Sequence, residues 1–209
     1  LQIRMLGSRR VKKNELLKTA AIVLAVNTII LIFLTREFGK NRYERKFGEI
    51  IFETTSDFSH IRVREKDNVR SLLFVEESGA EQRQSAIDLD APAELQLRYS
   101  RTIFVSLLFR QPQERILIVG LGGGGMVRFA NEVLPETQVD AIEIDPAVVE
   151  VANEFFGTRN GPKTTIHTAD AFVYLAEPHG PYDAIYMDAF LRPKADAGLE
   201  EVTLRLKTV

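Results

Sequence analysis

The stretch RILIVGLGGGGMVRFANEVLPETQVDAIEID, residues 115–145, decides the fold of this 209-residue chain. It begins with a short apolar run that predicts a strand buried on both faces. Five glycines follow almost at once, and a helix and a second strand come after them. Glycine accepts positive φ and carries no Cβ, so the backbone N–H groups of such a turn can approach a ligand closely. The order of strand, glycine turn, helix and strand therefore predicts a nucleoside-binding site.

A carboxylate at the end of the second strand supports this interpretation. Glu143 follows Gly120 by 23 residues (143 minus 120), and an acid about 20 residues after such a turn can accept both hydroxyls of a ribose. The glycines leave the kind of cofactor open. Gly120 and Gly122 fit the dinucleotide spacing GxGxxG together with Gly125, and they fit the methyltransferase spacing GxGxG together with Gly124.

Strands and helices alternate along the rest of this region. Asp145 is a natural N-cap, Pro146 suits the first helical position and Gly157 suits the C-terminal cap, so a helix is predicted between them. Further strands are predicted at about 164–168 and over 182–188, with a short helix between them. This alternation predicts an α/β fold with a parallel sheet and helices on both faces.

Three acids follow predicted strand ends. Ligands of parallel sheets bind beyond the carboxyl ends of the strands, and Glu143, Asp170 and Asp188 each lie at or just after such an end. We expect these carboxylates to gather near the glycine turn. Asp170 is equally suited to cap the helix that follows it.

The chain divides into five predicted segments. Three short β-rich runs, IRVRE (61–65), RSLLFVEE (70–77) and RQSAID (83–88), are separated by polar turns and predict hairpins over residues 51–92. Residues 93–209 are predicted to form the nucleoside-binding domain, beginning with a helix over 93–110. Because the chain ends soon after the fourth strand, we expect the sheet to be incomplete at its C-terminus. The first fifty residues comprise a basic segment (1–18), an apolar segment (19–35) and a charged linker (36–50).

The apolar segment predicts a membrane anchor. Residues 19–35 contain no charged side chain, and about 17 residues is the lower limit for a transmembrane helix. A cleaved signal peptide, a buried helix and an amphipathic surface helix are the alternatives. Residues 1–50 carry 11 Lys and Arg against 4 Asp and Glu, and such a basic start favours a membrane surface. The sequence therefore predicts a membrane-anchored protein with a single span and a cytoplasmic catalytic domain.

Composition narrows the classes of function. The chain has no cysteine, which excludes disulfides and thiolate nucleophiles, and its three histidines show no ligand spacing, so no metal site is predicted. Residues 51–209 carry 16 Lys and Arg against 25 Asp and Glu. An acidic body suits a cationic substrate better than nucleic acid.

Several motifs, in order and spacing, resemble those of the spermidine synthase family, the polyamine aminopropyltransferases with a methyltransferase-like fold. The resemblance covers roughly residues 52–193. It rests on SDFSHIRV at 56–63, Gln84-Ser85, Tyr99, GLGGGGMVR at 120–128, EIDP at 143–146, Asp170, and YDAIYMD at 182–188. It implies a Rossmann-like, methyltransferase-type sheet and decides against a dinucleotide.

The resemblance also implies a reaction. The donor would be S-adenosylmethionine or its decarboxylated form, and a small-molecule amine or polyamine would attack a carbon bonded to the sulfonium. Asp188 would orient the amine or receive its proton, Tyr99 and Gln84 would line the pocket, Glu143 would bind the ribose and Asp170 the adenine. The glycine turn would bind the donor without a metal, and a homodimer is a further expectation.

The chain departs from the family pattern at several acids. Gly123 stands where the family has the aspartate of GGGDGG, Ser100 and Arg101 replace the His-Glu of its YHE segment, and a second acid after Asp188 is missing. These departures leave methyl and aminopropyl transfer both open. They also leave a second class of function, a catalytically degenerate, membrane-tethered module that binds a nucleoside. An NAD-binding oxidoreductase is the third alternative.

Overall fold

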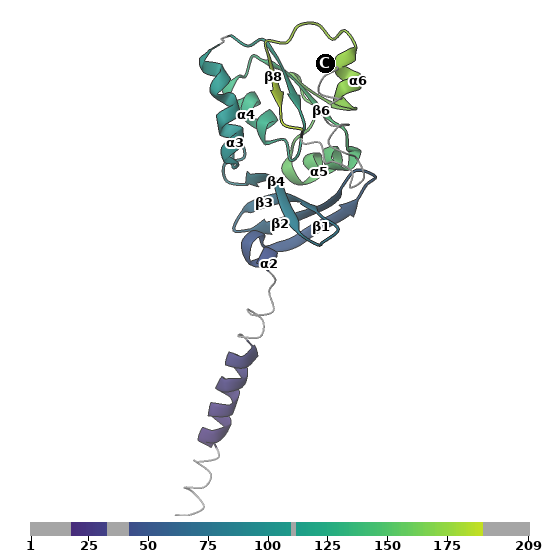
Figure 1. Cartoon of the computed structure of the whole chain (residues 1–209). Helices are drawn as coiled ribbons and strands as arrows, with labels where there is room; N and C mark the ends of the chain where they lie inside the picture. Colours follow the sequence, from purple (N-terminus) through teal and green to yellow (C-terminus); the bar gives the residue numbers. More distant parts are fainter. Residues whose placement is uncertain (1–17, 33–41, 110–111, 190–209) are drawn as a thin grey trace, which may run out of the picture. The chain divides into compact units, whose positions relative to one another are not determined.

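The computed structural model describes residues 18–32, 42–109 and 112–189 (Figure 1). The chain forms two compact units, residues 1–46 and residues 47–209.

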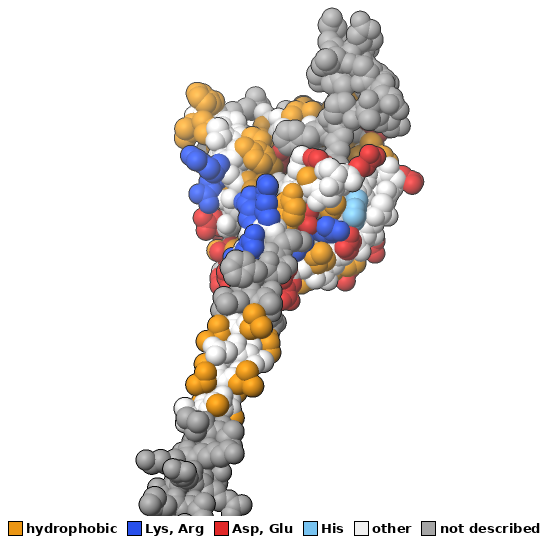
Figure 2. Space-filling model, turned by 60° about the horizontal axis from the view of Figure 1, so that its bottom comes forward, with side chains coloured by type: hydrophobic (Ala, Val, Ile, Leu, Met, Phe, Trp, Pro, Cys, Tyr) orange, Lys and Arg blue, Asp and Glu red, His pale blue; other side chains and the backbone are white. Residues whose placement is uncertain are grey.

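The first unit contains a helix over residues 18–32, all of which are exposed. Figure 2 shows apolar side chains on the face in view. The prediction of a membrane-anchored protein with a span over 19–35 is wrong on one finding: no described helix is long and apolar enough to cross a membrane. The 15 described helical residues extend about 22 Å at 1.5 Å each, whereas the hydrocarbon core is about 30 Å thick. Residues 33–35 lie outside the described part.

Residues predicted as a charged linker contain helix α2 (Arg42–Phe47) and the beginning of the first strand. That strand belongs to an antiparallel sheet with the order β1-β2-β3-β4. Its strands are β1 (Glu49–Thr55), β2 (His60–Lys66), β3 (Val69–Val75) and β4 (Glu81–Asp88). The sequence predicts the last three strands, whereas β1 is an addition. Asp67 and Asn68 both have positive φ in the two-residue turn between β2 and β3, as a tight hairpin requires.

The second sheet is parallel, as the alternation of strands and helices predicts, with the order β7-β6-β5-β8. Its strands are β5 (Arg115–Val119), β6 (Gln138–Glu143), β7 (Thr164–Thr168) and β8 (Ala184–Met187). The connecting helices are α4 (Gly125–Val133), α5 (Pro146–Phe156) and α6 (Ala171–Ala176). The helix predicted over 93–110 is shorter than expected and is divided into α3 (Arg98–Ile103) and the 3₁₀ helix η1 (Phe104–Leu108).

The central strand β5 is buried on both faces because its side chains alternate between two layers of helices. Ile116 and Ile118 pack into a core that includes α4, whereas Leu117 and Val119 pack with Tyr174 of α6. Figure 1 shows α3 and α4 on one side of the parallel sheet and α6 on the other. This arrangement brings the carboxyl ends of the strands and the glycine turn to one edge.

Helix α5 joins the two sheets. Its Val148, Val151 and Phe156 pack against Ile61 and Val63 of the antiparallel sheet, while Ala152 of the same helix belongs to the core of the parallel sheet. Figure 1 shows α5 between the sheets. Sheet β1–β4 therefore shares packing with the parallel sheet through α5.

Candidate functional site

The glycine turn begins where β5 ends. Gly120 has a φ of +97°, and a Cβ at this position would lie 2.8 Å from the carbonyl oxygen of Asp188. Positive φ and close backbone approach both require glycine. The N–H of Gly120 donates to the carbonyl of Ile142, and the N–H of Asp188 donates to the carbonyl of Val119. The turn and the end of β8 are thus fixed against each other by backbone contacts.

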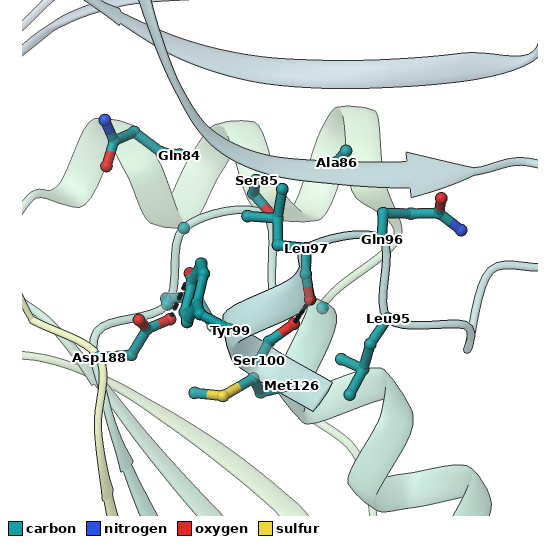
Figure 3. Close-up of a pocket in the computed structure, with 13 residues that line it drawn as sticks. Gln84, Ser85, Ala86, Leu95, Gln96, Leu97, Tyr99, Ser100, Met126 and Asp188 are labelled. Atoms are coloured by element: carbon teal, nitrogen blue, oxygen red, sulfur yellow. Dashed lines mark hydrogen bonds between the residues drawn. The ribbon is translucent and has the colours of Figure 1, made fainter. Parts of the chain in front are cut away.

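A small pocket opens beside this turn (Figure 3). Gln84 and Ser85 of β4, Tyr99 of α3, Gly122 of the turn and Asp188 all line it. Its volume is about 30 Å³, room for about two water molecules. A pocket of this size can hold a small polar group.

Tyr99 and Asp188 point toward one another in this pocket (Figure 3). The Tyr99 hydroxyl donates a hydrogen bond to Oδ2 of Asp188 over 3.1 Å. Burial raises the pKa of Asp188 to about 6, although the hydrogen bond from Tyr99 opposes the rise. Burial and the neighbouring carboxylate also raise the pKa of Tyr99, so the phenol remains a donor at neutral pH. The site therefore contains a carboxylate with a pKa of about 6 that accepts a hydrogen bond from a phenol.

Gln84 lies at the rim of the pocket. Its amide Nε2 donates to the carbonyl of Gln82 over 3.3 Å, and Figure 3 shows the side chain directed away from Tyr99 and Asp188. Ser100 and Met126 also line the pocket, although the sequence does not mark either as a site residue. The signal for Ser100 is its place beside Tyr99, where the family has a histidine.

Glu143 and Asp170 lie at the same edge of the sheet but do not line the pocket. Glu143 accepts hydrogen bonds from the N–H groups of Leu121 (3.0 Å) and Asp145 (3.1 Å). Asp170 caps α6, and its Oδ1 accepts from the N–H of Phe172 over 2.8 Å. Of the three acids expected near the turn, Asp188 alone lines the described pocket. In this structure Glu143 and Asp170 both accept hydrogen bonds from nearby backbone N–H groups.

Gly123 and Gly124 are crowded from behind the turn. A Cβ at Gly124 would lie 2.2 Å from Cγ2 of Thr158, and a Cβ at Gly123 would lie 2.8 Å from Cδ1 of Phe156 and 2.9 Å from Oγ of Ser85. The space that a side chain at position 123 needs is therefore occupied. No group of three side chains that could hold a metal occurs in residues 18–32, 42–109 and 112–189.

Comparison with known proteins gives consistent matches. Residues 96–198 match the spermine/spermidine synthase domain. The polyamine aminopropyltransferase of Vibrio vulnificus (strain CMCP6) is 33% identical over 172 residues, which are 80% of this chain and 57% of that protein. The eEF1A lysine and N-terminal methyltransferase of Mus musculus is 39% identical over 79 residues, which are 35% of this chain and 11% of that protein. The chain thus spans little more than half the length of the aminopropyltransferase.

A solved structure shares the fold. A probable spermidine synthase from Corynebacterium glutamicum ATCC 13032 aligns with a TM-score of 0.56 at 23% identity, over 68% of this chain and 53% of that chain. The predicted methyltransferase-like α/β fold with a parallel sheet is confirmed by this likeness. The relatives in sequence are transferases.

Proposed function

We propose that the chain, whose residues 96–198 match the spermine/spermidine synthase domain, belongs to that family and transfers an alkyl group from a sulfonium nucleoside to an amine. The observation that carries the proposal is the Tyr99–Asp188 hydrogen bond of 3.1 Å, in a pocket beside the glycine turn. A partly buried carboxylate at the carboxyl end of a parallel strand suits a cationic amine.

The donor would lie along the carboxyl edge of the sheet. Gly120, Gly122 and Gly124 would let the protein backbone approach the donor closely. Glu143 would accept hydrogen bonds from the ribose hydroxyls, and Asp170 would lie beside the adenine. A carboxylate oxygen has lone pairs for more than one hydrogen bond, so the local contacts of Glu143 and Asp170 are compatible with these roles. The site therefore fits S-adenosylmethionine or its decarboxylated form as donor substrate.

The reaction needs alignment and one proton acceptor. The amine nitrogen attacks the carbon bonded to sulfur, the carbon–sulfur bond breaks, and its electron pair stays on sulfur as a neutral thioether. The nitrogen becomes positively charged and loses a proton to Asp188 or to water. Holding the two reacting atoms in line provides much of the rate enhancement. Because the pKa of Asp188 is raised to about 6, its carboxylate is mostly ionised at pH 7 and is well matched to proton transfer.

The transferred group in this proposal is aminopropyl or methyl. Relatives of both kinds are similar to this chain, a polyamine aminopropyltransferase and a lysine and N-terminal methyltransferase. Both names imply nitrogen acceptors. Among the described residues that line the pocket, Asp188 is the only one with a charged side chain, which favours a cationic acceptor such as a polyamine.

The test is incubation of the chain with each donor, together with putrescine or spermidine. Methylthioadenosine as product would indicate aminopropyl transfer, and S-adenosylhomocysteine would indicate methyl transfer. Asp188→Asn should remove turnover while calorimetry still detects methylthioadenosine binding. Nucleoside binding without either product from the unsubstituted chain would contradict the proposal and favour a binding module.

A further inference from the structure

Arg128 contacts the glycine turn but does not line the pocket. It lies in the first turn of α4, directly after the glycines, and its side chain extends behind the turn toward the end of α5. Its guanidinium donates to carbonyl and hydroxyl oxygens, and these hydrogen bonds to described residues include none to a carboxylate. Burial lowers its pKa to about 10, so it remains protonated at neutral pH.

The guanidinium connects three separate segments. Nη1 donates to the carbonyl of Gly123, to the carbonyl of Phe156 over 3.1 Å and to the hydroxyl of Thr158 over 2.5 Å. Nε donates to the carbonyl of Pro92 over 2.9 Å. The carbonyl of Phe156 belongs to the C-terminus of α5, where the helix dipole favours a cation.

Thr158 also contacts the glycine turn. Its side chain is buried, its hydroxyl donates to the carbonyl of Gly123 over 3.0 Å, and its methyl group packs under Gly124. Two donors therefore hold the carbonyl of Gly123, and neither Arg128 nor Thr158 lines the pocket. The neighbouring Gly122 and Gly125 do line it.

A turn with this many glycines has little conformational preference of its own. Glycine loses more backbone entropy on ordering than any other residue, and a ligand that must order the turn binds more weakly as a result. Contacts that fix the turn before the ligand arrives remove that loss. From this geometry we propose that Arg128, with Thr158, is a positioning residue that preorders the glycine turn for the nucleoside.

This inference rests on the proposed function only in that the turn binds the nucleoside of the donor. Arg128 touches neither the reacting atoms nor the pocket. Its removal should therefore weaken nucleoside binding and leave the chemical step unchanged. A purely structural role would instead lower the stability of the whole domain without a specific effect on nucleoside affinity.

The test is calorimetric titration of the whole chain with methylthioadenosine, a probe that needs no turnover. We expect Arg128→Met to raise the Kd about tenfold, which corresponds to about 1.4 kcal/mol. Arg128→Lys keeps the charge but not the fork of donors, and should raise the Kd nearly as much. Guanidinium ion at millimolar concentration should partly restore binding in a third variant, Arg128→Ala, which leaves a larger space.

Arg115→Met is the matched control. Arg115 makes a comparable set of contacts, with Asp140 and the carbonyl of His179, but it lies at the first residue of β5, at the opposite end of that strand from the turn. Its substitution should lower the melting temperature and leave the Kd unchanged. An unchanged Kd in Arg128→Met, or equal weakening in both variants, would overturn the inference.

Turnover separates this inference from the proposed function. If the unsubstituted chain forms product, Arg128→Met should raise the KM for the donor and leave kcat within about twofold. If the chain binds methylthioadenosine but forms no product, the proposed function fails while the binding comparison still decides on Arg128. If the unsubstituted chain does not bind methylthioadenosine, the turn has no nucleoside to position, and the inference about Arg128 fails.

Discussion

At the scale of single residues, the site depends on a few side chains whose neighbours change their chemistry. Asp188 is an acid at a strand end in the sequence, but the fold partly buries it and places the Tyr99 hydroxyl against it. Gly123 stands where the resembled family has an aspartate. The fold shows that Phe156 and Ser85 occupy the space a side chain at this position would need. At both positions, the surroundings determine what the residue can do.

The pH dependence of turnover tests the Tyr99–Asp188 pair. Because the ionised form of Asp188 accepts the proton, kcat/KM should rise with pH through an inflection near 6. The hydrogen bond from Tyr99 lowers the pKa of Asp188, so Tyr99→Phe should move the inflection to higher pH. Initial rates between pH 5 and 9 provide the measurement. A shift to lower pH in Tyr99→Phe would show that the phenol does not stabilise the carboxylate.

Crowding behind the glycine turn predicts the effect of a methyl group at position 123. Gly123→Ala would place a Cβ 2.8 Å from the ring of the buried Phe156, and overpacking of this kind costs about 1–3 kcal/mol. Urea unfolding measures the change. Gly161→Ala is the control, because nothing lies within 4 Å of its Cβ and its φ is not positive. Equal stability of both variants would contradict the crowding.

At the scale of elements, α5 shows how far local sequence signals extend. Its predicted N-cap, first-turn proline and C-terminal glycine are confirmed at Asp145, Pro146 and Gly157. Local hydrogen bonding and φ preference determine these ends, so the sequence alone predicts them. The helix predicted over 93–110 was too long, because Leu95 packs into the core before α3 begins. Its apolar spacing does not distinguish a buried loop residue from a helical one.

The N-cap of α5, Asp145, provides a test at this scale. Its Oδ1 accepts from the N–H of Ala147 over 2.9 Å, and its Oδ2 accepts from the hydroxyl of Ser56 over 2.7 Å. Asp145→Ala should lower the free energy of unfolding by about 1–2 kcal/mol, because a cap is lost. Asp57→Ala, at an exposed aspartate, should change it by less than about 0.5 kcal/mol. Denaturant titrations compare them, and equal effects would contradict the cap.

At the scale of the second unit, residues 47–209, the two sheets depend on one shared helix. Phe156 of α5 packs with Ile61, Val63 and Leu72 of the antiparallel sheet, and its ring also lies behind Gly123. Helix α5 therefore connects the antiparallel sheet, the parallel sheet and the glycine turn. Loss of packing at this point should affect all three.

Phe156→Ala tests that connection. Truncation of a buried phenylalanine should lower the free energy of unfolding by about 3–5 kcal/mol, and it should weaken methylthioadenosine binding as well. Phe58→Ala is the control, since that ring is 51% exposed. Thermal unfolding and calorimetry give the two readouts. A variant that loses stability while nucleoside affinity remains unchanged would show that α5 does not support the turn.

The sequence by itself determined the order of strands and helices in the parallel domain, the glycine turn, the caps of α5 and the resemblance to a transferase family, because all of these depend on neighbours along the chain. Only the tertiary structure decided which acid lines the pocket, why Gly123 carries no side chain and what Arg128 contacts. Most of those answers come from residues far apart in the sequence, such as Tyr99 and Asp188, 89 positions apart, and Arg128 and Thr158, 30 positions apart. Periodicity and composition carry no information on such pairs.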